Sequence, residues 1–359
     1  MYELYRHADI KQALTGDEFT VAYPFRISKQ ILGETLLDID GRKHAELRRA
    51  AAYFFDSENI ARIEQSVFEP LARQILDALP VGKPIDFVRD CALRFPTATM
   101  SRLVGIRENE VAPLYRMVDY LVQHLDGSKG DFETASRYRE ELRLRLARDI
   151  LPRGEGALAR YVNGLDTGVG DGERIGLLLL ILFAGIETSV STLANTLSCL
   201  LRHPHHLDAM AHSPGFAASA LQEAIRWEPA QHETVRFAAA DCVVGGLQLR
   251  KGSALVLYLA SANRDEAVYR DADLFDPLRA EKHNLSFGLG RHYCLGKKFA
   301  LAALEGFLTR FFQRFRIAQG GLELAPVTGG MFRRPEHLRF TLSPAHPQRQ
   351  TQEHHHAEH

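Results

Sequence analysis

The chain has 359 residues, of which 45% are hydrophobic and 25% charged, and its formal net charge at pH 7 is -1. This length and apolar content allow a globular protein with one large core or two smaller ones. A net charge close to zero argues against bulk binding of nucleic acid.

The cysteine spacing and the length of the apolar stretches predict where in the cell the protein is located. Four cysteines are scattered without the spacing of a disulfide framework, which fits a reducing environment. No signal-peptide pattern opens the chain. The longest apolar stretch, residues 176–186, is shorter than the about 20 residues that span a bilayer, and Glu187 ends it. We therefore expect a cytoplasmic protein without membrane association.

Helical periodicity dominates the chain. Helices are predicted, in chain order, at 60–79, 86–103, 111–125, 132–151, 173–201, 216–227 and 297–312. Strand patterns are fewer, at 234–237, 242–245, 247–249, 254–259 and 338–342, with a hairpin turn at Gly245-Gly246. The sequence thus predicts a mainly α fold with a minor β-sheet, organised as a single domain at 1–343. Residues 344–359, rich in His, Gln and Pro, are expected to form a disordered tail.

The segment from Phe287 to Gly296 places a lone cysteine, Cys294, in a glycine-punctuated loop directly before a predicted helix. Glycines let a backbone pass close to a flat ligand and adopt turns closed to other residues. The free N–H groups and the dipole at a helix start stabilise a thiolate. A nucleophile, a redox thiol and a metal ligand all fit such a residue, but no neighbouring CxxC partner supports a thioredoxin-like motif.

A second segment, Ala184-Gly185-Ile186-Glu187-Thr188, lies inside the long predicted helix. Glycine in mid-helix costs about 1 kcal/mol relative to alanine. Glu187 and Thr188 are also costly in apolar surroundings unless they have partners or water. The segment therefore indicates either a ligand site with a proton-carrying pair or a kinked core helix with one solvated face.

Charged residues recur at four further places. The charged residues at any one of these places, taken alone, fit an ordinary solvent-exposed protein surface. Two helical pairs place both of their charges on one face, and a His–Arg pair is suited to clamp an anion. The residues are His44 with Arg48, Glu223 with Arg226, Arg236 at the start of a predicted strand, and Arg279 after a proline turn.

Taken in chain order, these motifs resemble the motif series of soluble bacterial cytochromes P450. The series is His-x-x-x-Arg, Ala-Gly-x-Glu-Thr, Glu-x-x-Arg, the later arginines and Phe-x-x-Gly-x-x-x-Cys-x-Gly, and the resemblance covers residues 4–342. It implies the P450 fold, with haem b between the long central helix and the cysteine loop. The chain begins near the family's first sheet, so the resemblance also implies a short N-terminus.

The resemblance implies a role for each matching residue. Cys294 would be the axial ligand of the haem iron, and its thiolate donates electron density that favours O–O cleavage. Glu187 and Thr188 would deliver protons to dioxygen. Glu223, Arg226 and Arg279 would form a structural ion network behind the haem. His44, Arg48, Arg236 and His292 would hold the haem propionates. The remaining cofactor-binding positions are Ala184, Gly185, Phe287, Gly288, Gly290 and Gly296.

The resemblance also suggests partners and a substrate wall. Electrons would come from NAD(P)H through a ferredoxin and a ferredoxin reductase, docked on a basic patch of Arg48, Arg49, Arg291, Lys297 and Lys298. A small organic substrate, neither nucleic acid nor membrane, would contact Ile181, Gln231, His232, Glu233, Thr234, Met331 and Phe332. Polar residues facing inward there would favour a hydrogen-bonding or cationic group, as in natural-product tailoring.

Three functions remain open at this stage. The first is a haem-thiolate monooxygenase that hydroxylates or epoxidises its substrate. The second is a haem-thiolate enzyme that couples or rearranges without inserting oxygen. The third is a catalytically silent haem-binding or recruitment protein. The intact Glu187-Thr188 pair favours oxygen activation but does not exclude coupling.

Overall fold

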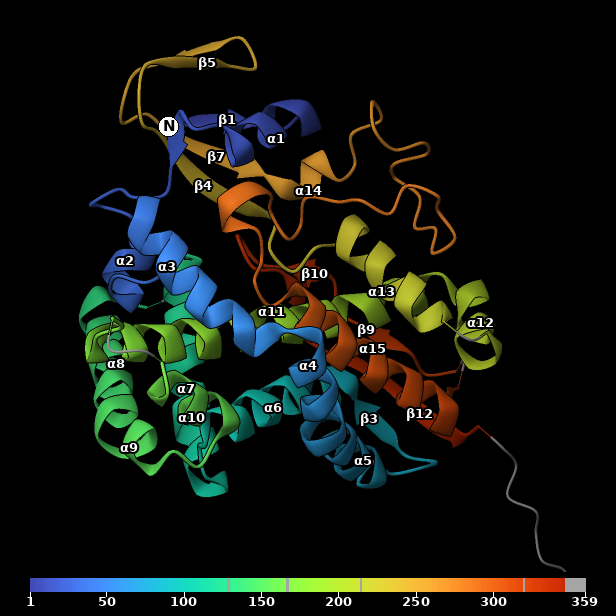
Figure 1. Ribbon diagram of the computed structural model, residues 1–359. Helices are drawn as coiled ribbons and strands as arrows, with labels where there is room; N and C mark the ends of the chain where they lie inside the picture. The colour runs from blue at the N-terminus through green and yellow to red at the C-terminus, as the bar shows by residue number, and fades with distance from the viewer. Residues whose placement is uncertain (128–129, 166–167, 214, 319, 346–359) are drawn as a thin grey trace, which may run out of the picture.

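Helix α11 (Asp171–Arg202) runs through the centre of the molecule, and the rest of the chain packs around it (Figure 1). The computed structural model describes residues 1–127, 130–165, 168–213, 215–318 and 320–345. By length and composition α11 could cross a membrane, but 67% of its most apolar window is buried inside the protein. Burial of this kind is typical of the core helix of a large domain.

The other helices lie around α11, and most of the predicted ones match their observed bounds within a few residues, whereas the shorter helices at 7–15, 27–32, 41–52, 157–163, 207–212 and 259–262 lie outside the predicted ranges. They are α1 (His7–Thr15), α2 (Ile27–Leu32), α3 (Gly41–Ala52), α4 (Ser57–Ile63), α5 (Glu69–Asp77), α6 (Arg94–Val104), α7 (Glu108–Leu125), α8 (Phe132–Arg145), α9 (Leu151–Arg153), α10 (Ala157–Asn163), α12 (Leu207–His212), α13 (Phe216–Trp227), α14 (Leu259–Ala262) and α15 (Lys297–Arg314).

Local chemistry explains several helix ends. The Asp56 side chain caps α4 by accepting from the Asn59 N–H at 2.7 Å, and Asp131 caps α8 in the same way. Gly105 ends α6 in the left-handed conformation. Wider, π-helical turns interrupt two of the predicted helices, at Glu64–Phe68 and Leu146–Ile150.

Two four-stranded sheets and two hairpins complete the described part of the fold. The first sheet has the order β1-β7-β4-β2, with β1 parallel to β7 and β4 antiparallel to β7. The predicted Gly245-Gly246 turn joins β5 to β6, and both glycines have positive φ angles. The strands are β1 (Tyr2–Leu4), β2 (Phe19–Thr20), β3 (Pro84–Asp86), β4 (Glu233–Ala238), β5 (Cys242–Val244), β6 (Leu247–Leu249), β7 (Ala254–Tyr258), β8 (Phe315–Ile317), β9 (Glu323–Leu324), β10 (Val327–Thr328), β11 (Arg334–Pro335) and β12 (Leu338–Pro344).

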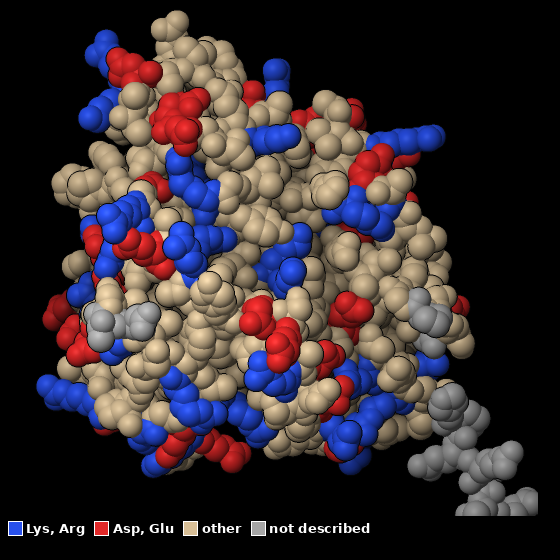
Figure 2. Space-filling model, viewed as in Figure 1, with Lys and Arg blue, Asp and Glu red and all other residues tan. Residues whose placement is uncertain are grey.

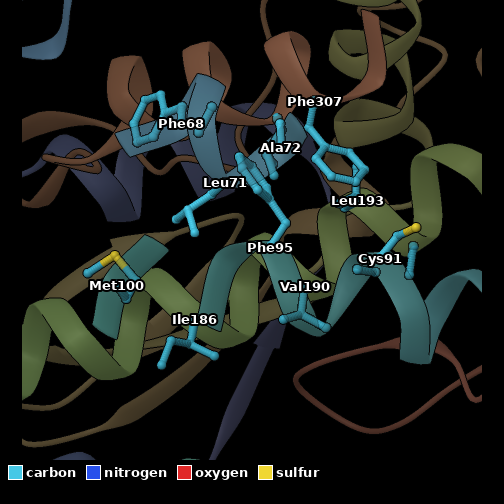
Figure 3. Close-up of a cluster of buried hydrophobic side chains, with 14 of the residues drawn as sticks. Phe68, Leu71, Ala72, Cys91, Phe95, Met100, Ile186, Val190, Leu193 and Phe307 are labelled. Carbon is cyan, nitrogen blue, oxygen red and sulfur yellow. The ribbon is translucent and has the colours of Figure 1, made fainter. Parts of the chain in front are cut away.

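The main core joins α11 to α5, α6 and α15. Figure 3 shows Phe95 and Phe307 facing one another above Ile186 and Val190 of α11, and the two rings lie 4.6 Å apart. A second cluster packs α1 against the first sheet. The functional residues lie where α3, the loop before α15, and the middle of α11 approach one another between these two cores (Figure 1).

The predicted mainly α fold with a minor sheet is confirmed. One predicted helix starts too early, because residues 84–86 form strand β3 and a π-helical turn at Val88–Ala92 follows before α6. The last strand extends to Pro344, the first residue of the predicted tail, whereas residues 346–359 lie outside the described residues.

Candidate active site

The loop before α15 holds Cys294 in a fixed, half-buried position. The Cys294 N–H donates to the Phe287 carbonyl at 2.8 Å, which closes the loop on itself. Gly288 and Gly290 have φ angles of 66° and 68°. A side chain at Gly290 would also place its Cβ 2.9 Å from the Leu14 carbonyl, so only glycine fits there. The chain therefore bends sharply and presents the cysteine just ahead of the helix.

Opposing influences act on the Cys294 thiol. Burial raises its pKa, while hydrogen bonds from the N–H groups of Gly296 and Lys297 and the charge of Arg48 act to lower it. Arg48 also donates to the Tyr293 carbonyl. The Lys297 ammonium lies 5.1 Å from the centre of the Phe287 ring. The loop thus combines a desolvated thiol with donors and cations that favour its thiolate when a metal binds.

The middle of α11 has one face that the protein leaves uncovered. Ala184 is exposed although its helix is buried on both sides of it, and Ile181, Gly185 and Thr188 are half-buried. These four residues follow the i, i+3, i+4, i+7 spacing of one helix face. At the edge of this face, Gly185 and Ala300 of α15 line the same small gap. The stripe is an apolar surface with one hydroxyl, close to the start of α15.

Cationic and imidazole side chains gather beside the cysteine loop. The His44 and His292 rings lie 4.3 Å apart, and burial, with His292 and Arg48 nearby, lowers the pKa of His44 to about 4. Arg236 is only 6% exposed, and burial, with Arg26 nearby, lowers its pKa to about 10. Its guanidinium donates to the neighbouring Val235 carbonyl at 2.9 Å. Within the described ranges, no carboxylate forms an ion pair with Arg236.

Two residues of this cluster were not predicted from the sequence. Asp40 accepts from His292 at 2.7 Å and also from Thr20, and these bonds hold its pKa well below its usual range although burial acts to raise it. Arg26 is half-buried beside Asp38, at 3.8 Å. Neither residue belongs to a recognisable motif, so the sequence offered no signal for them. Asp40 positions His292, and Arg26 adds a further cation to the cluster.

Glu187 and Thr188 lie on different sides of α11. The Thr188 hydroxyl donates to the Ala184 carbonyl at 2.7 Å, on the open stripe. Glu187 is 3% exposed and accepts from Ser191 at 3.1 Å. It also forms an ion pair with Arg334 of β11, which the sequence analysis missed. Adjacent helical residues do not face one another, so the acid and the alcohol point in different directions.

Glu223, Arg226 and Arg279 form a buried ion network, as the sequence analysis expected. Arg226 donates to both carboxylate oxygens of Glu223, at 2.7 and 2.9 Å. Arg279 lies 3.3 Å from the same carboxylate. All three residues are less than 10% exposed. The network fixes the long segment before the cysteine loop against α13.

The predicted substrate residues come from two segments that lie side by side. Gln231 pairs with Phe332 in an isolated β-bridge, and the His232 N–H donates to the Met331 carbonyl at 2.8 Å. The His232 imidazole bonds to Glu228 at 2.8 Å instead of remaining free. Glu233 is half-buried, and burial raises its pKa.

The other two residues of the predicted substrate wall, Thr234 and Ile181, lie in β4 and α11. Thr234 is the second residue of β4 and pairs with Leu257 of β7. Ile181 is the first residue of the open stripe on α11. The wall thus reaches from the first sheet to the central helix.

A family model described as Cytochrome P450 matches residues 216–338, which include the ion network and the cysteine loop. A chain of Mycobacterium tuberculosis named "Putative cytochrome P450 141" is 29% identical over 324 residues, covering 86% of this chain and 80% of its own. In its motifs, its sequence and its fold, the chain matches cytochromes P450. It is an enzyme of the P450 monooxygenase class, and its mainly helical fold is the P450 fold.

Relatives with known roles and solved structures support this assignment. The nocardicin C N-oxygenase of Nocardia uniformis is 28% identical over 358 residues, covering 94% of this chain and 88% of its own. The LnmA P450 hydroxylase from the leinamycin pathway of Streptomyces atroolivaceus superposes with a TM-score of 0.79 at 28% identity, covering 94% of this chain and 89% of its own. CxnD, a P450 for C–S bond formation in chuangxinmycin biosynthesis, has a TM-score of 0.83 at 23% identity and shares the fold, covering 95% of this chain and 89% of its own.

The family implies a haem, and three features of this chain fit one. The open stripe on α11 offers an apolar face that the protein leaves accessible. Cys294 is a desolvated thiol among donors and cations. Arg236 is a buried guanidinium without a carboxylate partner in the described chain, as expected of a residue whose anion is a propionate of the cofactor. Cys294 would therefore bind the iron, and Arg236 with its cationic neighbours would hold the propionates.

Removing Arg236 is expected to weaken haem binding. A charged hydrogen-bond donor contributes about 1.5–3 kcal/mol, so Arg236→Ala lowers haem retention by roughly that amount, and Arg48→Ala acts in the same direction. Retention is measured by transfer of haem to apomyoglobin. Arg250→Ala, an exposed arginine after β6, is the control and keeps its haem. Full haem occupancy and unchanged thermal stability in both variants would show that these residues do not hold the haem.

Proposed function

We propose that this P450 inserts one oxygen atom of dioxygen into a small organic substrate, by hydroxylation or epoxidation, in bacterial natural-product biosynthesis. The observation that carries the proposal is the position of Thr188, whose hydroxyl lies on the open stripe of α11 while the acid Glu187 is buried behind it. The nocardicin N-oxygenase and the leinamycin hydroxylase, which act in natural-product pathways, support the biosynthetic setting.

A thiolate-bound haem supplies the oxygen-activating chemistry. The chain's own residues hold and protect that chemistry. The Phe287 carbonyl accepts from the Cys294 N–H at 2.8 Å, and the Phe287 ring would limit access of water to the sulfur. The Thr188 hydroxyl donates its own hydrogen to the Ala184 carbonyl. Its oxygen can therefore accept a hydrogen bond from a group on the open face. Glu187 supplies the acid of the pair.

The substrate wall supports a molecule with a cationic or hydrogen-bonding group. Glu233 is a half-buried carboxylate whose pKa is raised by burial and by the nearby Asp126. Among the described residues, no side-chain donor is bonded to the Glu233 carboxylate. The Gln231 amide donates to the Glu233 backbone carbonyl at 2.9 Å and not to this carboxylate. A desolvated acid of this kind gains most from an amine that approaches it.

We further propose that electrons reach the protein from NAD(P)H through a ferredoxin and its reductase, in the cytoplasm. The sequence carries no flavin or iron–sulfur motif. Arg49 and Lys298 are exposed beside the cysteine loop, whereas Arg48, Arg291 and Lys297 already contact groups of the protein. Figure 2 shows this face, where basic and acidic side chains are interspersed. A docking partner would therefore meet a small number of free cations rather than one broad basic field.

Replacing Thr188 by alanine is expected to uncouple the enzyme. Haem and substrate binding persist because no bond to either is lost, but the hydroxyl that presents protons is missing. General acid catalysis contributes roughly 10²–10⁴-fold, so product per NADH falls steeply and peroxide accumulates. Thr192→Ala removes the equivalent hydroxyl one turn along α11 and serves as the matched control. An unchanged ratio of product to NADH in Thr188→Ala would refute the role given to this residue.

The proposed reaction is tested with a panel of amine-bearing and neutral natural products. Binding is detected first by the shift of the haem spectrum from low to high spin. Ligands that bind are then incubated with NADH, ferredoxin, reductase and isotopically labelled dioxygen. One labelled oxygen in the product supports insertion. A coupled product without label would replace the proposal with coupling chemistry, and binding without turnover across the panel would leave only a haem-binding role.

A further inference from the structure

A buried arginine holds the acid of the proton-delivery pair. Glu187 is 3% exposed, and its carboxylate forms an ion pair with the Arg334 guanidinium. Ser191, one turn along α11, donates to the same carboxylate oxygen at 3.1 Å. Arg334 comes from β11, 147 positions away in the chain, and β11 packs directly on α11. The carboxylate is therefore fixed toward β11 and not toward Thr188.

Helix α7 supplies a second acid to the same arginine. The Arg334 guanidinium lies 3.9 Å from the Asp119 carboxylate, which also accepts from Gln123 at 2.7 Å. Tyr115 of α7 lies near both charges, and its pKa is raised mainly by burial. Burial acts to lower the pKa of Arg334, but Glu187, Tyr115 and Asp119 outweigh it and raise that pKa. Arg334 is thus a permanent cation placed between two carboxylates on two helices.

The geometry leaves Glu187 unable to serve Thr188 without a change of partner. The Thr188 hydroxyl is bonded to the Ala184 carbonyl on the open stripe, while the Glu187 carboxylate is paired on another side of the helix. A buried carboxylate held by an arginine and a hydroxyl donor keeps its position. The shortest change that frees it is a movement of the guanidinium from Glu187 to Asp119, which is already close.

We propose that Arg334 is the positioning residue of the proton-delivery pair, which holds the Glu187 carboxylate away from Thr188 and releases it by moving onto Asp119. The inference rests on the proposed function of Glu187 and Thr188. The groups that face Glu187 are Ser191 on its own helix, Arg334 on β11, and Tyr115 and Asp119 on α7. Arg334 supplies the positive charge of this group.

The first test measures the state of the carboxylate and needs no turnover. Without its cation, a buried carboxylate takes up a proton rather than remain charged. In the substrate-free ferric holoenzyme at neutral pH, Arg334→Gln is expected to show the infrared band of a protonated carboxyl group. The band should be absent from the wild type, from Arg334→Lys and from the double variant with Glu187→Gln. No such band in Arg334→Gln, or a band that survives in the double variant, would overturn the proposal.

The second test separates positioning from structure by kinetics. Arg334→Gln and Asp119→Asn are each expected to lower kcat by roughly 10-fold, a part of the 10²–10⁴-fold that a general acid supplies, with KM unchanged. Arg334→Lys restores most of the rate. Arg333→Gln, whose arginine bonds the Val327 carbonyl on the same hairpin, is the matched control and keeps kcat. Equal kcat in wild type and Arg334→Gln would overturn the proposal.

The two tests also distinguish this inference from the function on which it rests. If Glu187→Gln itself leaves product per NADH unchanged, the role of Glu187 in proton delivery is wrong, and the infrared result still reports on the ion pair alone. If Glu187→Gln uncouples the enzyme while Arg334→Gln behaves as wild type in both tests, the proton role stands and Arg334 is merely structural.

Discussion

Replacing Cys294 by serine is expected to abolish the thiolate-type spectrum and the oxygenase activity together. A serine hydroxyl keeps its proton under conditions in which a metal-bound cysteine loses it, so the electron donation that favours O–O cleavage is lost. The measurement is the absorption of the reduced, carbon-monoxide-bound protein. The wild type should show the band of thiolate-ligated haem, and Cys294→Ser should not. The size of this effect makes it the strongest test of the site.

The control uses another cysteine of the same chain. Cys242 is half-buried in β5, outside the cysteine loop. Cys242→Ser should therefore retain both the spectrum and the activity. Because the loop is closed by the backbone bond from Cys294 to the Phe287 carbonyl, Cys294→Ser is also expected to fold. A wild-type spectrum typical of histidine-ligated haem would refute the assignment of Cys294.

The elements that carry the site were predictable because their signals are local. The apolar run of α11, the strand patterns around Gly245-Gly246 and the glycine-bounded cysteine loop each depend on neighbouring residues. Local patterns determine periodicity, turns and helix starts. The π-helical turns were not predictable, because they depend on how α5 and α8 pack against the rest of the chain.

The partners of the polar side chains were mostly beyond the sequence. A buried carboxylate needs a cation or hydrogen-bond donors, so the sequence predicted that Glu187 requires a partner. No sequence spacing identifies Arg334 as that partner. The same holds for Arg26 and Asp40 beside the propionate cluster. The bond between His232 and Glu228 was within reach, since the two residues are four apart. Local rules thus predict that a partner is required, and only the fold determines which residue provides it.

Replacing Arg226 by alanine is expected to cause the largest loss of stability. Arg226 is 1% exposed and donates to Glu223 and to the carbonyls of Asn263, Ala272 and Leu274. Removing one partner of a buried ion pair typically costs about 3–5 kcal/mol. The free energy of unfolding of the holoprotein, measured by denaturant titration, should fall by that amount.

Two further variants make this prediction specific to the network. Arg226→Lys should recover little, because an ammonium group cannot reach the carboxylate and three carbonyls that the planar guanidinium bonds at once. Arg42→Ala removes an exposed partner of Glu46 and should leave the free energy of unfolding almost unchanged, because ion pairs in contact with solvent contribute little. If Arg226→Ala proves too unstable to purify, Arg226→Lys still gives a measurable loss. A loss of unfolding free energy for Arg226→Lys as small as that for Arg42→Ala would contradict the prediction. In that case the remaining pair of Glu223 and Arg279 would hold the segment before the cysteine loop without the Arg226 guanidinium.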